Sequence, residues 1–223
     1  ITVDCEHSDI GLERFTDIIR GIYDRGIAPF ARVRENDTLA IRQVLDCGAV
    51  GVIVPLVDTA EDAKKAVRAA KYPPNGERGF AFCRANNWGT DFDEYAKEAN
   101  RQVMVIIMIE SKAAVENINE IVQLEGVDGV FIGPYDLSGS YGVVGNTNHE
   151  KIVTARKLVI EACKKHNKIA GLHDVCPTEA SIKSAVGEGF SFIALGTDGH
   201  FLRESANNAL KAAQKAILSF KRV

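Results

Sequence analysis

The sequence predicts an α/β fold of parallel strands and helices, which we interpret as a (β/α)₈ barrel whose first strand and helix are missing from the chain. Short apolar runs alternate with helix-period segments from Ile1 to Val223. Parallel neighbours need a crossover connection, and helix-period segments separate successive apolar runs. Charged side chains stand where several runs end, as they do at the active rim of a barrel.

Seven strands are predicted, each a short apolar run bounded by polar or turn residues. They begin at Ile1, Ala28, Val50, Val103, Gly129, Lys168 and Phe190. Helices are predicted over residues 12–23, 38–48, 59–71, 112–124, 149–166 and 178–186, and from Phe201 onward. Asp37 is one expected N-cap and Asp58 or Thr59 is the other, because a short polar side chain there accepts a hydrogen bond from the first turn.

The strand count bears on how complete the barrel is. A closed barrel has eight strands and typically about 250 residues, whereas this chain of 223 residues supplies seven strands. The chain begins without Met and inside a strand, so we expect one strand and one helix to precede it. The single domain then spans residues 1–223 and is N-terminally incomplete. The alternative is an open, doubly wound sheet, which would spread the polar residues along a crevice.

Composition excludes several classes of protein. A hydrophobic share of 46% suffices for a large core, and 27 Lys and Arg against 30 Asp and Glu give a net charge of −3. We expect no nucleic-acid partner, because no basic run offers a phosphate-binding surface. The sequence shows no long apolar stretch or signal segment, so we expect no membrane association. Five scattered cysteines outside any CxxC pair indicate a reducing, cytoplasmic setting.

Two carboxylates mark the centre of the predicted rim. Glu110 follows strand 103–109 and Asp136 follows strand 129–133, with a crossover helix between them. The two strands should be parallel neighbours, so both carboxylates lie at the same end of the sheet. Such a pair can bind a hard divalent cation and leave positions open for substrate and water. Taken singly, either residue would more often cap a helix or face solvent.

Other strand ends add an acid–base candidate and a cation. Asp4, Cys5, Glu6 and His7 close the first strand, and Arg32 closes the second. A lone histidine or arginine in such a place is usually structural. Their convergence with two carboxylates on one rim predicts a catalytic site.

Seven motifs make the chain similar to a known family. They are VDCEHS, PFARVREND, VIVPLVDTAEDAKKAV, YPPNGERG, MIES, VDGVFIGPYDLS and GVVGNTNHEKI, in this order. With them the chain resembles, over essentially its whole length, the HpcH/HpaI family of metal-dependent pyruvate aldolases, which are TIM barrels of the phosphoenolpyruvate/pyruvate superfamily. The resemblance implies a carbon–carbon lyase of class II. Such an enzyme reversibly cleaves a 2-keto-3-deoxy acid to pyruvate and an aldehyde.

The resemblance also implies roles for individual residues. Glu110 and Asp136 match the metal ligands, and their oxygen donors suit Mg²⁺, Mn²⁺ or Co²⁺. Arg32 matches the arginine that binds pyruvate, while Asp4 and His7 match the acid/base dyad. In cleavage, His7, oriented by Asp4 directly or through a water, would remove the proton of the C4 hydroxyl. Arg32 would stabilise the developing enolate oxygen.

Further residues would complete the substrate pocket. The backbone of Gly133, Pro134 and Tyr135 would face the pyruvate carboxylate. His173 ends strand 168–173 and would project toward the rim, where the family usually carries an apolar residue. An imidazole there could bind a polar or anionic aldehyde, or hydrogen-bond to its neighbour Asp174.

Two lysines bear on the choice between metal and imine chemistry. Lys112 starts a helix, and Lys168 lies at the opposite end of its strand from the rim. Neither is placed to form a Schiff base with the substrate, so a metal mechanism is favoured over covalent imine catalysis.

Other functions stay open. A lyase or decarboxylase could use the same metal and enolate chemistry on a citramalyl- or malyl-CoA thioester or on oxaloacetate. No basic patch in the sequence favours a CoA ligand. A non-catalytic barrel that binds a keto acid or a metal is the third possibility. Asp4 and His7 argue against it, since binding alone needs no base.

Several residues lie outside this predicted site. Arg78 in the long loop 73–91 either serves function or ties down the loop, and Trp88 serves an interface or packing. We assign no role to His149, His166 or His200.

The last predicted helix carries an apolar stripe. Its members are Phe201, Leu202, Leu210, Ala213, Ile217 and Leu218. The stripe either packs on its own barrel or, as the superfamily resemblance implies, is exchanged with a neighbouring copy. We therefore expect a homo-oligomer, a hexamer built from dimers or trimers.

Overall fold

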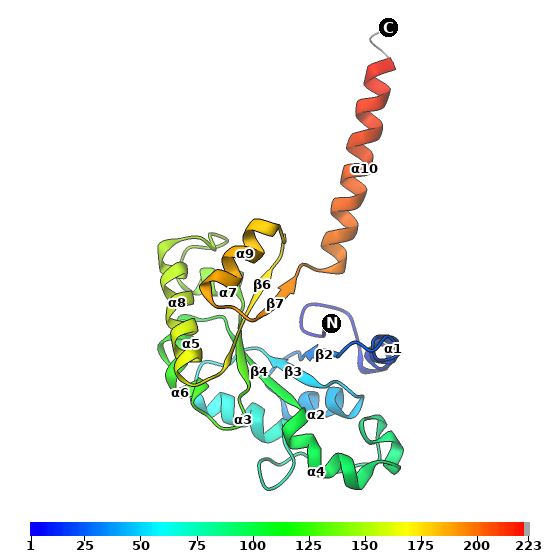
Figure 1. The fold of residues 1–223 in the computed structure, drawn as a ribbon, viewed down its shortest axis with the longest axis vertical. Helices are drawn as coiled ribbons and strands as arrows, with labels where there is room; N and C mark the ends of the chain where they lie inside the picture. The colour runs from blue at the N-terminus through cyan, green and yellow to red at the C-terminus, as the bar shows by residue number, and fades with distance from the viewer. Residues whose placement is uncertain (221–223) are drawn as a thin grey trace.

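A single parallel sheet organises the computed structural model, which describes residues 1–220 (Figure 1). Its strands are β1 (Thr2–Asp4), β2 (Phe30–Arg32), β3 (Gly51–Val54), β4 (Met104–Ile109), β5 (Gly129–Ile132), β6 (Ile169–Asp174) and β7 (Phe192–Leu195). Each strand pairs in parallel with the next one in the chain, in the order β1 to β7. The doubly wound alternative is wrong, because it requires a point where the strand order reverses.

Helices connect the strands, as alternating periodicity predicted. They are α1 (Leu12–Tyr23), α2 (Thr38–Asp46), α3 (Ala60–Ala70), the 3₁₀ helix η1 (Arg84–Gly89), α4 (Phe92–Gln102), α5 (Lys112–Glu116), α6 (Ile118–Val122), α7 (Pro134–Ser140), α8 (Glu150–Lys165), α9 (Glu179–Glu188) and α10 (Asp198–Phe220). The expected helix 112–124 is two short helices. They meet at Asn117, whose side chain donates to the Asp58 carbonyl oxygen at 2.9 Å.

The sequence pattern did not predict α4 or α7. Helix α4 buries only Ala99, so it lacks the apolar stripe that marks a packed helix. The predicted caps are confirmed: the Asp37 side chain accepts from the Ala40 amide at 2.9 Å, and Thr59 forms a capping box with Asp62.

The sheet is curled, and a contact between side chains on two distant strands shows this. The rings of Phe30 on β2 and Phe192 on β7 lie 5.6 Å apart, although four strands separate β2 from β7 in the sheet order. Both rings pack on an inner cluster made by Ile53, Ile106, Met108 and Phe131. The larger core cluster fills the space between the sheet and the helices outside it. The structure therefore shows a curled, all-parallel sheet with a packed interior.

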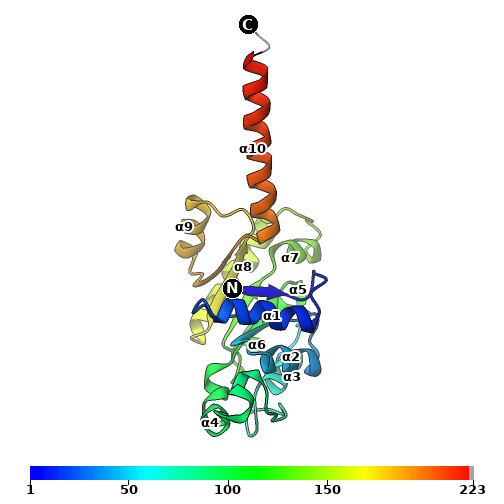
Figure 2. The ribbon, with the colours of Figure 1, turned by 90° about the vertical axis from the view of Figure 1, so that its right-hand side faces the viewer.

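Helix α10 stands away from this body (Figures 1 and 2). None of its residues is buried, and Leu202, Leu210, Ile217 and Leu218 are each more than half exposed. The alternative in which its stripe packs on its own barrel is therefore wrong. No helix within residues 1–220 is both long and apolar enough to cross a membrane.

The loop after α3 is tied down by Arg78. This side chain is fully buried, donates to Asp46 Oδ1 at 2.7 Å and lies over the Tyr72 ring at 4.6 Å. These contacts support the alternative in which Arg78 ties down the loop. Trp88, in contrast, is 63% exposed and available for an interface.

Lys71, at the end of α3, anchors the C-terminal end of α4. Its side chain is only 5% exposed, and its ammonium group donates to the carbonyl oxygens of Asn100 and Val103. We predict that Lys71→Met lowers the free energy of unfolding by about 1–3 kcal/mol, because two carbonyl groups lose their hydrogen bonds. Urea denaturation measures the change. Lys65→Met on the exposed face of α3 is the control and should stay within about 0.5 kcal/mol of wild type; equal effects of the two variants would contradict the prediction.

Candidate active site

The predicted site residues lie at or just after the carboxyl ends of the strands, and side-chain alternation places Arg32, Glu110 and His173 on the inner face of the sheet. Side chains alternate across a strand, so Arg32 shares the inner face with Phe30, and Asp4 lies opposite Arg32 in the pairing of β1 with β2. Ile109 pairs with Ile132, which pairs with Leu172. The next residues along, Glu110, Gly133 and His173, therefore form one row at the inner rim. They share the parity of Met108, Phe131 and Gly171, which stand inside the curl.

Arg32 and Asp4 form a bidentate ion pair. Arg32 Nε donates to Asp4 Oδ1 at 2.8 Å and Nη2 donates to Oδ2 at 2.5 Å. Burial raises the pKa of Asp4, but the hydrogen bonds and charge of Arg32 outweigh this effect and hold the pKa of Asp4 below its usual value. The pair fixes the plane of the guanidinium group, which is the part of Arg32 that could meet a substrate anion.

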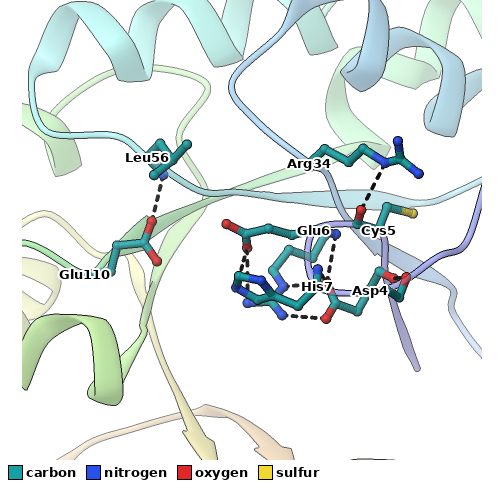
Figure 3. Close-up of polar contacts among 9 residues, drawn as sticks. Asp4, Cys5, Glu6, His7, Arg34, Leu56 and Glu110 are labelled. Carbon is teal, nitrogen blue, oxygen red and sulfur yellow. Dashed lines mark hydrogen bonds and ion pairs between the residues drawn. The ribbon is translucent and has the colours of Figure 1, made fainter. Parts of the chain in front are cut away.

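Glu6 completes this charge cluster. Its carboxylate lies 3.2 Å from Arg32 Nη1 and 3.7 Å from His7 Nε2, and its side chain is 13% exposed (Figure 3). Asp4 accepts hydrogen bonds from the backbone amides of Glu6 and His7 instead. The carboxylate nearest to the imidazole is thus Glu6. This geometry leaves Asp4 to act on the His7 ring only through an intervening group such as water.

Glu110 is held by the loop that follows β3. Its Oε1 accepts from the Leu56 amide at 2.7 Å, and Leu56 adopts the left-handed conformation with φ of 58° (Figure 3). Burial raises the pKa of Glu110, and the negative charge of Asp136 raises it further, whereas the Leu56 hydrogen bond lowers it. Asp136 stands in the first turn of α7, which Pro134 starts.

The residues present fit a divalent metal ion. Two carboxylates from neighbouring strand ends repel each other here, and a cation between them would remove the repulsion. Gly133 keeps the space beside Glu110 open, since a Cβ at this position would meet Glu110 Oε2 at 3.3 Å. Within residues 1–220, no cluster of three or more His, Cys, Asp or Glu could hold a metal. Two carboxylates with other positions left to substrate and water are the donor set of Mg²⁺-type ions.

His173 stands in the same row as Glu110 and Gly133. Its Nε2 is buried and has no hydrogen-bond partner. Burial lowers the pKa of His173, a hydrogen bond with the Gly196 backbone raises it, and the charge of Arg32 lowers it. Because the charges of Arg32 and Asp4 both act on the pKa of His173, the imidazole lies near this ion pair.

Sequence reasoning missed two parts of the site. Glu6 is a strand-end acid in the sequence, but the motif match assigns roles only to its neighbours Asp4 and His7. The Leu56 amide could not be found, since a backbone donor depends on the loop conformation and not on the side chain. The structure does bring together Asp4, Arg32 and Glu110, together with Glu6, at one end of the sheet.

A curled, all-parallel sheet with carboxylates, an arginine and histidines at the carboxyl ends of its strands is the arrangement typical of α/β enzymes. The comparison with known proteins is more specific. The chain belongs to the HpcH/HpaI aldolase/citrate lyase family, whose model matches residues 3–205. This match confirms the resemblance carried by the motifs, and with it the class of enzyme, a carbon–carbon lyase of aldolase type.

Two relatives cover almost the whole chain. One, named 5-keto-4-deoxy-D-glucarate aldolase, from Enterobacter sp. (strain 638), is 33% identical over 100% of this chain and 83% of its own. The other, named 2-keto-3-deoxy-L-rhamnonate aldolase, from Salmonella paratyphi A, is 36% identical over 94% of this chain and 78% of its own.

Solved structures agree with the fold. An HpcH/HpaI aldolase/citrate lyase family protein from Burkholderia cenocepacia J2315 has a TM-score of 0.90 at 30% identity, over 96% of this chain and 84% of the other. The citrate synthase SbnG has a TM-score of 0.85 at 29% identity, over the same shares of the two chains.

The ion pair between Arg32 and Asp4 should make a contribution to the free energy of unfolding that depends on pH. Because the pKa of Asp4 is lower in the folded state, the pair stabilises the fold fully above the unfolded value of about 3.9. This contribution is lost as the pH falls through the lower, folded-state pKa. Arg32→Met should raise the pKa of Asp4 and make the free energy of unfolding less dependent on pH below about 4. Carboxylate NMR shifts and urea denaturation against pH measure both effects, and an unchanged pKa of Asp4 would contradict the assignment.

Proposed function

We propose that the chain is a divalent-metal-dependent aldolase that reversibly cleaves a 4-hydroxy-2-oxo acid, of the 2-keto-3-deoxy type, into pyruvate and an aldehyde. The observation that carries the proposal is the meeting of Glu110, Asp136 and Arg32 at one end of the sheet, because a 2-keto acid presents both metal-chelating oxygens and negative charge. The names of the two relatives, both keto-deoxy acid aldolases, support it.

Glu110 and Asp136 are the residues that would hold the ion, with Mg²⁺, Mn²⁺ and Co²⁺ as the candidates. A bound ion supplies Lewis-acid polarisation of the keto group. The Gly133 backbone, with Pro134 and Tyr135 at the start of α7, would bind the pyruvate carboxylate. Pro134 has no amide hydrogen and the Gly133 amide donates to the Ile109 carbonyl oxygen at 3.3 Å, so within this segment the role would fall to the Tyr135 amide in the first turn of α7.

Arg32 would stabilise the negative charge that develops on the enolate oxygen. Asp4 and Glu6 hold the guanidinium in place from two sides, so little reorganisation is needed when the charge forms. His7 is 64% exposed and stands at the solvent side of the cluster, where it would take the proton from the C4 hydroxyl during cleavage. In the condensation direction the same imidazole returns that proton.

The positions of the two lysines support this mechanism over an imine. Lys168 donates to the carbonyl oxygens of Leu124 and Val127 at the amino end of β6. Lys112 forms an ion pair with Glu116 on the outside of α5. Both ammonium groups are engaged away from the row of Glu110 and His173.

We further propose that the curled sheet supplies seven strands of a (β/α)₈ barrel, that residues 1–223 belong to one aldolase domain, and that six copies form a homo-oligomer. The approach of Phe192 to Phe30 supports closure, since it brings the two ends of the sheet toward each other. The exposed stripe of α10 supports assembly, because a helix with exposed leucine and isoleucine side chains needs a partner to cover it.

The proposed chemistry can be tested without knowing the aldehyde. With Mn²⁺ or Mg²⁺, the protein should exchange the methyl protons of pyruvate for deuterium, as followed by proton NMR, and EDTA should stop the exchange. Absence of exchange with Mg²⁺, Mn²⁺ and Co²⁺ alike would overturn the proposed function.

Glu110→Gln locates the metal in the same experiment. It should weaken Mn²⁺ binding, measured by electron paramagnetic resonance, by at least about tenfold, since a neutral amide replaces a charged ligand. Glu116→Gln removes an exposed carboxylate in the following helix and is the matched control. Equal Mn²⁺ affinity of the two variants would place the metal elsewhere.

Assembly through α10 makes a separate prediction. Leu210→Glu combined with Ile217→Glu should reduce the mass measured by light scattering, because both charges enter the apolar stripe. Asn208→Glu with Lys215→Glu is the control, since these two positions lie about 200° around the helix axis from Leu210 and Ile217. A monomeric wild type at micromolar concentration would refute the oligomer.

A further inference from the structure

The two oxygens of the Glu110 carboxylate have different surroundings. Oε1 accepts a hydrogen bond from the Leu56 amide at 2.7 Å, on the side of β3 (Figure 3). Oε2 lies on the side of β5 instead, since a Cβ at Gly133 would meet it at 3.3 Å. The charge of Asp136, in the first turn of α7, acts on the same carboxylate. The protein therefore fixes one oxygen of Glu110 and leaves the other on the side of the second carboxylate.

The Leu56 amide reaches Glu110 from a backbone conformation that is unfavourable for leucine. Leu56 has φ of 58°, in the left-handed region, where the Cβ of an L-residue crowds its own backbone. Its side chain is 63% exposed, so burial of the leucine does little to offset this strain. Such a conformation persists only where the surrounding contacts impose it. The contacts that hold the segment after β3 are therefore part of how Glu110 is oriented.

Asp58 ties this segment to the next unit of the fold. Its side chain accepts a hydrogen bond from the hydroxyl of Ser111, the residue that directly follows Glu110. Its carbonyl oxygen accepts from the Asn117 side chain at 2.9 Å, where α5 meets α6. Asp58 thus fastens the segment after β3 at two points of the chain that follows Glu110.

The other polar contacts around Asp58 serve the helix caps. The amides of Asp58 and Thr59 donate to Asp62 Oδ2 at 3.3 and 3.0 Å, in the first turn of α3. The Ser111 hydroxyl caps α5, since its oxygen accepts from the Ala114 amide at 2.9 Å while its proton goes to Asp58. The bond from Ser111 to Asp58 therefore links the cap of α5 directly to the segment after β3.

We propose that Asp58 is a positioning residue, which holds the strained Leu56 amide on Glu110 Oε1 and so leaves Oε2 to bind the divalent ion. The inference rests on the proposed function, because it takes Glu110 as a metal ligand. Asp58 acts only through the Leu56 amide. A carboxylate that is already restrained loses less freedom when an ion binds, so the restraint raises the affinity for the ion.

Two substitutions of Asp58 separate its hydrogen bond from its charge. Mn²⁺ affinity, measured by electron paramagnetic resonance, should fall by about tenfold in Asp58→Ala. In Asp58→Asn it should stay close to that of wild type, because the amide oxygen of asparagine still accepts from Ser111. Glu61→Ala, which removes an exposed carboxylate from the first turn of α3, is the matched control and should also bind like wild type. Equal losses in Asp58→Ala and Asp58→Asn would show an effect of charge alone and would overturn the inference.

A second measurement needs no metal ion. Hydrogen–deuterium exchange of the Leu56 amide, followed by mass spectrometry of overlapping peptides, should be at least about tenfold faster in Asp58→Ala than in wild type, because the amide is no longer held on its acceptor. Asp58→Asn should exchange like wild type. Urea denaturation of the same variants detects a general loss of stability. A less stable Asp58→Ala with unchanged Leu56 exchange and unchanged Mn²⁺ affinity would show a merely structural aspartate and overturn the inference.

The two proposals fail in different ways. A wild type that neither binds Mn²⁺ nor exchanges the protons of pyruvate refutes the proposed function, and this inference with it. A wild type that does both, beside an Asp58→Ala variant with unchanged Mn²⁺ affinity, refutes only the role of Asp58.

Discussion

The bidentate pair between Arg32 and Asp4 is the interaction on which the site depends. It joins β1 and β2 at their carboxyl ends, and it fixes a guanidinium whose remaining Nη1 is engaged by Glu6 at 3.2 Å. A planar group held by two carboxylates has little freedom left to lose when an anion binds, so its charge is oriented in advance. Removing any one of these three side chains would leave a partly buried charge without its partner.

The curl of the sheet turns this local pair into part of a pocket. Phe30 lies two residues before Arg32 on β2 and on the same face of the sheet. Its ring packs against that of Phe192 on β7, the last strand of the sheet. Gly171 makes room for these rings, since a Cβ there would meet Phe131 at 2.7 Å and Phe192 at 3.0 Å. The aromatic packing inside the curl thus sets how far His173 on β6 stands from Arg32 on β2.

Much of the fold could be predicted because parallel strands have a simple signature. Buried runs such as β4 and β5 need no alternation, and polar caps such as Asp37 mark where the next helix starts. The strand-end positions of Glu110 and Arg32 follow from the same pattern. What could not be predicted depends on three-dimensional context: α4 buries only Ala99, the Leu56 amide is available because of a left-handed residue, and α10 extends from the body with no contact that the sequence could specify.

The electrostatics of the rim link binding to stability. Burial and the charge of Asp136 raise the pKa of Glu110, and burial raises that of Glu6, with the charge of Glu110 adding to it. Arg32 offsets part of this repulsion, yet three carboxylates, Asp4, Glu6 and Glu110, act on this one guanidinium, and Asp136 adds its negative charge beside Glu110. A ligand that brings positive charge to Glu110 and Asp136 therefore gains affinity from repulsion already present in the fold. Because such a ligand binds only the folded chain, an ion at 100 times its dissociation constant would stabilise the fold by about 2.7 kcal/mol. The repulsion between Glu110 and Asp136 that makes the rim costly to fold would thus favour a cation between these two carboxylates.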